Sequence, residues 1–198
     1  MQNIDAISRH EKGELLWERI KATLLAAEHY SRKDVLDESC QVPFKNGVYA
    51  WYFKNIPFKV PTVGCQTKEG KMLLYIGISP SKDGKSDSPQ NLRKRIRSHF
   101  KGNASVSTLR KSLGVLLGLK LVCHGKRKTF TREDEVRLNE WMDDNAYVAW
   151  VEAEHPWEHE IALIENLCPP LNIKDNHNNS FAKELKQLRK CYPLTSLS

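Results

Sequence analysis

The sequence lacks the cysteine patterns that build metal knuckles or disulfide frameworks. It has 5 cysteines, an odd number, and no two of them form a Cys-x-x-Cys pair. They are Cys40, Cys65, Cys123, Cys168 and Cys191. This scatter favours neither a zinc knuckle nor a disulfide scaffold. Cys123 with His124, or Cys168 with His177, are conceivable ligand pairs, but we interpret them as buried thiols and loop imidazoles.

Long apolar runs are also absent. The most apolar stretch, residues 113–123, is short and contains Lys120, so we expect no segment that spans a membrane. Residues 1–12 mix acidic and basic side chains without an apolar core, which is unlike a secretory signal peptide. No internal repeat is visible. These absences predict a cytoplasmic protein with no membrane partner.

The length and the charge of the chain limit its domain organisation and the class of its partner. A chain of 198 residues with 40% hydrophobic content is long enough for one domain with a sizeable core, together with extensions. The formal net charge of +7 favours a polyanionic partner. Many basic proteins bind no nucleic acid, so the charge alone leaves the class of partner open.

Apolar periodicity predicts the order of the elements. Strands are expected at 48–53, 72–78 and 147–152, and helices at 13–30, 91–101, 131–144, 156–167 and 181–191. Asn91 and Thr131 are candidate helix N-caps, because their side chains accept hydrogen bonds from free backbone N–H groups. The apolar stretch 109–121 fits either a helix or a buried strand, and residues 125–128 form a basic turn.

The helix predicted at 91–101 has two distinct flanks. Leu92, Ile96 and Phe100 form its narrow apolar stripe. Arg95 and His99 lie four residues apart on one flank, where a guanidinium can bind phosphate oxygens and an imidazole can relay a proton. The other flank carries Arg93, Arg97 and Lys101. The alternative for the whole helix is a basic solvated face without catalytic value.

Glu160 is the most informative acidic residue. It falls in the apolar arc of the helix predicted at 156–167, whereas Glu158 and Glu165 fall on the polar side and near the rim. An ionised, unpaired carboxylate in such a place costs several kcal/mol, so it is expected to be paired, protonated or bound to a metal. A buried ion pair with Arg95 is the alternative to a metal ligand.

Taken in order, these elements resemble the GIY-YIG nuclease superfamily. The matching elements are Gly47-Val48-Tyr49, Tyr75-Ile76-Gly77, Asn91-Leu92 followed by Arg95 and His99, then Glu160, and finally Pro169-Pro170-Leu171-Asn172. The superfamily includes the incision subunit of bacterial nucleotide excision repair, certain intron-homing endonucleases and a few restriction enzymes. Val48 replaces the isoleucine of the family name, and the stretch between His99 and Glu160 is longer than in compact members.

The resemblance implies an α/β (α+β) fold with a small three-stranded antiparallel sheet flanked by helices. It places a nuclease domain at 46–175, with an inserted helical segment at about 102–145. Residues 1–45 then form an N-terminal helical extension, and residues 176–198 form a C-terminal helix.

The resemblance also implies phosphodiester hydrolysis with one divalent cation, Mg²⁺ or Mn²⁺, held by Glu160. A lone carboxylate suits Mg²⁺, which keeps several waters and takes phosphate oxygens as its other ligands. A two-metal site would need a second carboxylate, and the sequence offers no second candidate.

The roles implied for the remaining site residues are specific. Tyr49 helps to activate the attacking water, Tyr75 orients it, and Arg95 stabilises the transition state. Asn172 positions the helix or a phosphate oxygen. A phenol with a pKa of about 10 is ionised only about once in a thousand molecules at neutral pH, so Tyr49 needs help, and His99 is the obvious proton acceptor. The alternative for both tyrosines is simple packing in the core.

A metal-dependent DNA endonuclease is therefore the leading hypothesis. The residues expected to contact DNA phosphates are Arg93, Arg97, Lys101, Lys126, Arg127 and Lys128. A second hypothesis is a nucleic-acid-binding module without catalysis. The sequence argues against it, because every expected polar position holds a residue that can perform the expected role. A third is a nuclease subunit of a repair or restriction complex.

Overall fold

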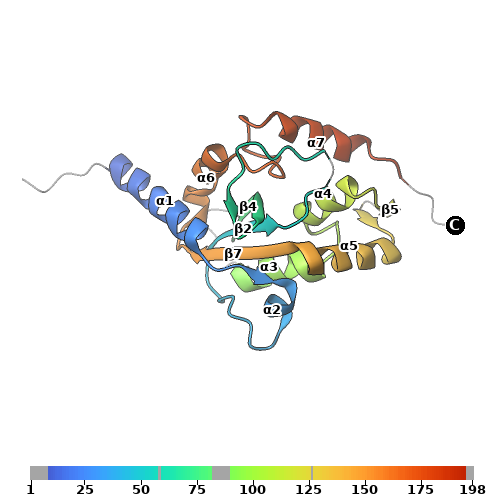
Figure 1. Cartoon of the computed structure of the whole chain (residues 1–198), viewed down its shortest axis with the longest axis horizontal. Helices are drawn as coiled ribbons and strands as arrows, with labels where there is room; N and C mark the ends of the chain where they lie inside the picture. Colours follow the sequence, from blue (N-terminus) through green and yellow to red (C-terminus); the bar gives the residue numbers. More distant parts are fainter. Residues whose placement is uncertain (1–8, 58, 82–89, 126, 195–198) are drawn as a thin grey trace, which may run out of the picture.

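The protein is described here by a computed structural model, which covers residues 9–57, 59–81, 90–125 and 127–194 (Figure 1). The helices are α1 (Arg9–Ala26), α2 (Arg32–Leu36), α3 (Leu92–Lys101), α4 (Thr108–Leu116), α5 (Arg132–Asn145), α6 (Glu160–Leu167) and α7 (Ser180–Cys191), with a 3₁₀ turn, η1, at Pro156–Glu158. The strands are β1 (Tyr30–Ser31), β2 (Gly47–Phe53), β3 (Thr67–Lys68), β4 (Lys71–Ser79), β5 (Leu121–His124), β6 (Arg127–Phe130) and β7 (Ala146–Glu152). Within this part of the chain, no helix has the length and apolar character needed to cross a membrane.

The main sheet has 5 strands in the order β1-β7-β2-β4-β3, and every pairing is antiparallel. The α+β class is confirmed, but the expected sheet of three strands is wrong in number. The three long strands are those predicted, and β1 and β3 add 2 residues each at the edges. Two residues are too few to show an alternating pattern. Tyr30 was expected at the end of the first helix, but α1 ends at Ala26 and Tyr30 pairs with Val148.

Strand β2 lies in the middle of the sheet and is covered on both faces. All 7 of its residues are buried. Alternate residues from Tyr49 to Phe53 pack in the cluster that holds side chains of α3, α4 and α5, whereas those from Val48 to Tyr52 pack against α1 and α6. The alternation of side chains along a strand therefore directs Tyr49 toward α3. Figure 1 shows α3 and α6 on opposite sides of the sheet.

Helix α3 has the predicted bounds and the predicted buried face. The side chain of Asn91 accepts a hydrogen bond of 3.0 Å from the backbone N–H of Lys94, which satisfies one free donor at the helix start. Leu92, Ile96 and Phe100 are completely buried. This packing fixes the rotation of α3, so that Arg95 and His99 lie toward the sheet.

The segment 102–145 contains α4 and α5 and, between them, the hairpin β5–β6, which the sequence pattern does not predict. Helix α4 ends at Leu116, and Gly118 has a φ of 74°, a backbone conformation that glycine adopts without strain. Of the basic turn expected at 125–128, Gly125 lies at the connection of the hairpin, Arg127 and Lys128 belong to β6, and Lys126 lies outside the described residues. The apolar stretch 109–121 lacks a clear periodicity, so the sequence alone is compatible with either a helix or a strand there.

The single helix predicted at 156–167 is wrong, because two elements occupy this range. The backbone N–H of His159 donates to the carbonyl of Pro156 at 3.2 Å, which closes the short turn η1, and α6 then begins at Glu160. Glu160 is therefore the first residue of its helix. A carboxylate is favoured there by the partial positive charge of the helix N-terminus.

Candidate active site

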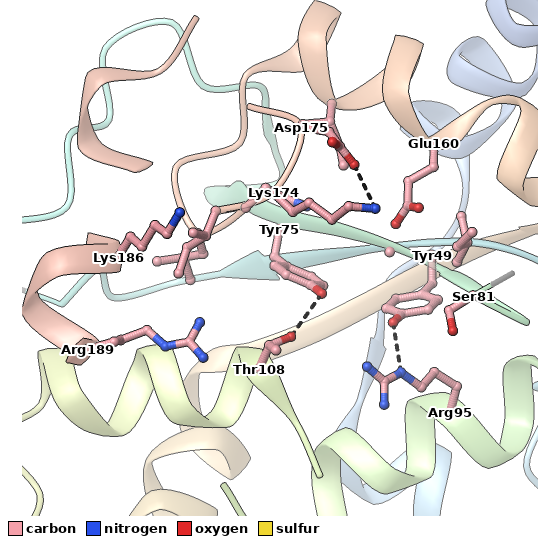
Figure 2. Close-up of a pocket in the computed structure, with 16 residues that line it drawn as sticks. Tyr49, Tyr75, Ser81, Arg95, Thr108, Glu160, Lys174, Asp175, Lys186 and Arg189 are labelled. Atoms are coloured by element: carbon pink, nitrogen blue, oxygen red, sulfur yellow. Dashed lines mark hydrogen bonds and ion pairs between the residues drawn. The ribbon is translucent and has the colours of Figure 1, made fainter. Parts of the chain in front are cut away.

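A pocket of about 460 Å³ is lined by residues from six helices and strands of the fold, β2, β4, α3, α4, α6 and α7, and from the loop after α6. Five of the six predicted catalytic residues line it, namely Tyr49 of β2, Tyr75 of β4, Arg95 of α3, Glu160 of α6 and Asn172 of the following loop (Figure 2). The sixth, His99, lies behind Tyr49 and is completely buried. The residues are distant in the sequence, and the fold brings them together.

The position of Tyr49 depends on a glycine in the neighbouring strand. Tyr49 pairs with Gly77 across β2 and β4. A Cβ atom on Gly77 would lie 2.5 Å from the hydroxyl oxygen of Tyr49, which is closer than real Cβ contacts. The tyrosine ring therefore occupies the space that a side chain at position 77 would take. This explains the glycine of Tyr75-Ile76-Gly77 by close approach rather than by a turn.

The hydroxyl group of Tyr49 makes two polar contacts. It lies 2.9 Å from Nε2 of His99, and Nε of Arg95 donates to it at 3.3 Å. Burial raises the pKa of Tyr49 well above its usual value, and the neighbouring Tyr75 raises it further, while Arg95 opposes this shift. Tyr49 is therefore a neutral phenol in the protein without substrate.

His99 is held between Tyr49 and the start of α4. Its Nδ1 lies 2.7 Å from Oγ of Ser107, and that oxygen also accepts a hydrogen bond from the backbone N–H of Arg110. Burial lowers the pKa of His99 well below its usual value, and the positive charges of Arg95 and Arg110 lower it further. The imidazole is therefore neutral and has a hydrogen-bond partner at each ring nitrogen.

The strand register places Tyr75 on the same face as Tyr49, because Gly77 pairs with Tyr49 and Tyr75 pairs with Trp51, and a β-bulge follows directly beside Tyr75. Trp51 pairs with Tyr75 but Tyr52 pairs with Leu73, so one extra residue lies in β4. Such bulges redirect side chains and are frequent beside active sites. The hydroxyl of Tyr75 lies 3.4 Å from Oγ1 of Thr108, and burial raises its pKa. Both phenols thus reach the pocket from adjacent strands.

Arg95 has donors to spare. Its Nε donates to Tyr49, and its Nη1 donates to the carbonyl of Val106 at 3.2 Å. A guanidinium has five N–H donors, so three remain for a ligand in the pocket. Arg95 is therefore both a fixed neighbour of Tyr49 and a candidate binding group for phosphate.

Glu160 is half-buried and forms no ion pair with any residue that the structure describes, so the alternative of a pair with Arg95 is not formed. Burial raises the pKa of its carboxyl, which the positive charge of Lys174 opposes. In Figure 2 the ammonium of Lys174 lies between Glu160 and Asp175, and it is paired with Asp175 at 3.2 Å.

The donor set fits Mg²⁺ or Mn²⁺ better than a fully protein-ligated metal. Within the described ranges no group of three or more His, Cys, Asp or Glu side chains could hold an ion. Mg²⁺ is commonly held by one or two carboxylates, with waters and substrate phosphates completing the shell. Glu160 lines the pocket and forms no ion pair within the described part of the chain, so it fits this pattern.

Asn172 ties the loop after α6 to the edge of β4. Its Oδ1 accepts a hydrogen bond from the backbone N–H of Ile76, and its Nδ2 donates to the carbonyl of Ile76, both at 2.8 Å. The N–H of Leu171 donates to the carbonyl of Leu74 at 2.9 Å. Strand β3 pairs only with the first residues of β4, so this loop supplies the hydrogen-bond partners for the free edge groups of Leu74 and Ile76.

The residues expected to contact DNA are distributed over two regions outside the pocket. Arg93 donates from Nε and Nη2 to the carbonyls of Val42 and Cys40, and Arg97 donates to the carbonyl of Leu36 at 3.2 Å. Both keep unused N–H donors, so a role in phosphate binding stays a prediction. Lys101 and Arg127 are exposed, Lys128 is partly exposed, and Lys126 lies outside the described residues.

Six further polar residues line the pocket without having been predicted as site residues. They are Ser81, Thr108, Lys174, Asp175, Lys186 and Arg189. The last two come from α7, which the sequence suggested only as a C-terminal helix. Lysine and arginine at such positions are common on any solvated helix, so the sequence carries no signal that separates them.

The chain matches a known protein family. A family model described as the GIY-YIG catalytic domain matches residues 47–191, a range that includes the three long strands, the pocket and α7. No curated protein and no solved structure matches the chain significantly.

Proposed function

The chain belongs to the GIY-YIG catalytic-domain family, and from this premise we propose that it is a divalent-metal-dependent endonuclease that hydrolyses DNA phosphodiester bonds. The match also confirms the resemblance inferred from the sequence. The observation that carries the proposal is the convergence of Tyr49, Tyr75, Arg95 and Glu160 in one pocket. Two phenols, a guanidinium and a carboxylate suit water-mediated attack on a phosphate diester.

Glu160 would hold one Mg²⁺ or Mn²⁺ in this pocket. When bound, the cation would neutralise charge on the phosphate and favour the ionised forms of nearby oxygen acids. The raised pKa of Glu160 reflects a carboxylate that burial has deprived of solvent, and the positive charges of Lys174 and Arg95 offset this only in part. A cation removes that unfavourable state, so metal binding and ionisation of Glu160 are expected to support each other.

Arg95 would bind a non-bridging oxygen of the scissile phosphate. Its side chain is already held by Tyr49 and by the carbonyl of Val106. Its remaining donors therefore need little reorganisation to meet charge that develops in the transition state. A lysine would supply the charge without the planar arrangement of donors.

Tyr49 would orient the attacking water through its hydroxyl, and His99 would orient that hydroxyl. When Nδ1–H of the neutral imidazole donates to Ser107, Nε2 accepts a hydrogen bond from the Tyr49 hydroxyl. Proton transfer from Tyr49 to His99 is opposed by the lowered pKa of His99. We therefore assign His99 a positioning role in the proposed mechanism.

The test is cleavage of labelled duplex, branched and single-stranded DNA with Mg²⁺, with Mn²⁺ and with chelator. We expect cleavage only with metal and its loss in Glu160→Gln, because the amide cannot supply an anionic ligand. Glu165→Gln is the matched control, since Glu165 is exposed on the same helix. A purified protein that binds DNA but cuts none of these substrates would instead support a binding module.

A further inference from the structure

Helix α7 forms one wall of the pocket with basic side chains. Phe181, Ala182 and Leu185 bury one face of the helix in the core. Lys186 and Arg189, one turn apart, line the pocket. Figure 2 shows both side chains extending from α7 toward the part of the pocket that holds Tyr75 and Thr108.

Arg189 is a partly buried cation with few partners. Its Nη1 lies 3.4 Å from Oγ of Ser112, a long contact to a neutral group. No carboxylate among the described residues lies within ion-pair distance of Arg189 or of Lys186. Partial burial of a guanidinium without a counter-ion is unfavourable unless an anionic ligand binds. A planar guanidinium in a pocket suits a phosphate in particular.

We propose that Arg189 and Lys186 bind a backbone phosphate of the DNA strand, adjacent to the scissile phosphate. The proposal rests on the proposed function, because it uses the same pocket and the same substrate. Contacts of these two cations with phosphate oxygens would position the strand and would carry no sequence information directly. Helix α7 is then part of the substrate-binding surface.

The test is equilibrium binding of a labelled DNA duplex and a labelled single strand, measured in chelator over a range of salt concentrations. Arg189→Gln is expected to weaken binding about tenfold. It should also lower the slope of log affinity against log salt by about 0.9 for duplex DNA or about 0.7 for a single strand. Lys186→Gln should act in the same direction, and Arg189→Lys should recover the slope but only part of the affinity.

Lys33→Gln is the charge-matched control, because Lys33 is exposed on α2 and lies outside the pocket. It should leave the affinity and the slope unchanged. If Arg189→Gln unfolds the protein, Lys186→Gln decides, because its side chain is exposed. Wild-type affinity and slope in both glutamine variants would overturn the proposal.

The outcomes separate this proposal from the proposed function. Weaker binding in the α7 variants, together with a wild-type protein that cuts no substrate, would support the α7 surface and reject the nuclease. Normal cleavage by the wild-type protein, together with unchanged binding in the α7 variants, would reject the α7 surface alone. A wild-type protein that bound neither duplex nor single strand would reject both.

Discussion

The hydroxyl oxygen of Tyr49 lies 2.9 Å from Nε2 of His99, in a buried contact between strand β2 and helix α3. The same hydroxyl accepts a hydrogen bond from Arg95. One phenol is thus held by a neutral ring on one side and by a cation on the other. This arrangement fixes the direction of its O–H group, which a freely rotating tyrosine on a strand would not have.

Tyr49→Phe is expected to lower the cleavage rate by about 10²-fold or more, because it removes the hydroxyl and keeps the ring. The unfolding free energy should fall by about 1–3 kcal/mol, since Nε2 of His99 is left buried without a partner. Cleavage rates and denaturant unfolding measure the two effects.

Tyr52→Phe is the matched control for this change. The hydroxyl of Tyr52 is also buried, but it has no hydrogen-bond partner in the described structure and packs on the other face of β2. Its removal should leave cleavage unchanged and raise stability by about 1 kcal/mol or leave it unaltered.

Combining Tyr49→Phe with His99→Gln should cost much less than the sum of the two separate rate losses, because the residues act as a unit. Full additivity would contradict the coupling.

Gly77→Ala is expected to displace the ring of Tyr49, since the added Cβ would lie 2.5 Å from its hydroxyl oxygen. Cleavage should fall about as far as in Tyr49→Phe, and stability should fall by about 1–3 kcal/mol through overpacking. Gly13→Ala is the control, because Gly13 is exposed in α1 with nothing within 4 Å of its added Cβ. That change should stabilise the helix by about 0.5–1 kcal/mol and leave cleavage unaltered.

Asn172→Ala is expected to release the loop after α6 from the edge of β4. Two buried hydrogen bonds to Ile76 are lost, and the backbone groups are left unsatisfied, which should cost about 2–4 kcal/mol in denaturant unfolding. Asn166→Ala removes an exposed amide that contacts Lys21 at 3.2 Å, and it should cost less than about 0.5 kcal/mol. Equal losses in the two variants would contradict the role assigned to Asn172.

His29 is expected to make the protein less stable in mild acid. Burial lowers its pKa to about 4, helped by Lys71 and Lys68 and opposed by Glu69, and neither ring nitrogen has a hydrogen-bond partner in the described structure. Between about pH 6.5 and that value, the unfolded chain binds a proton that the folded protein does not. The unfolding free energy should therefore decrease as the pH is lowered through this window. This group contributes at most about 1.4 kcal/mol per pH unit.

His29→Phe is the variant that measures this contribution. The ring of His29 packs 4.1 Å from that of Tyr52, so phenylalanine keeps the contact and removes the titrating group. Its unfolding free energy should depend less on pH than that of the wild type between pH 4 and 6.5. Parallel profiles for the two proteins would show that His29 does not titrate differently on folding.

The sequence predicted those parts of the site that depend on a local pattern. The stripe of Leu92, Ile96 and Phe100 predicted both α3 and the flank on which Arg95 and His99 lie, because helical periodicity decides which side chains share a face. The sequence did not predict the start of α6. The apolar pattern runs through 156–167 without a break, and the short turn at Pro156–Glu158 depends on how the chain packs against the sheet.

By itself, the sequence determined the three long strands, the buried face of α3, the family and five of the residues that line the pocket, because each follows from a local periodicity or from a motif in fixed order. Only the tertiary structure decided the two-residue edge strands, the close approach of Tyr49 to Gly77 and the placement of Arg189 in the pocket. The physical reason is that these features join segments far apart in the chain. Their geometry depends on how helices and strands pack together, which no single stretch of sequence encodes.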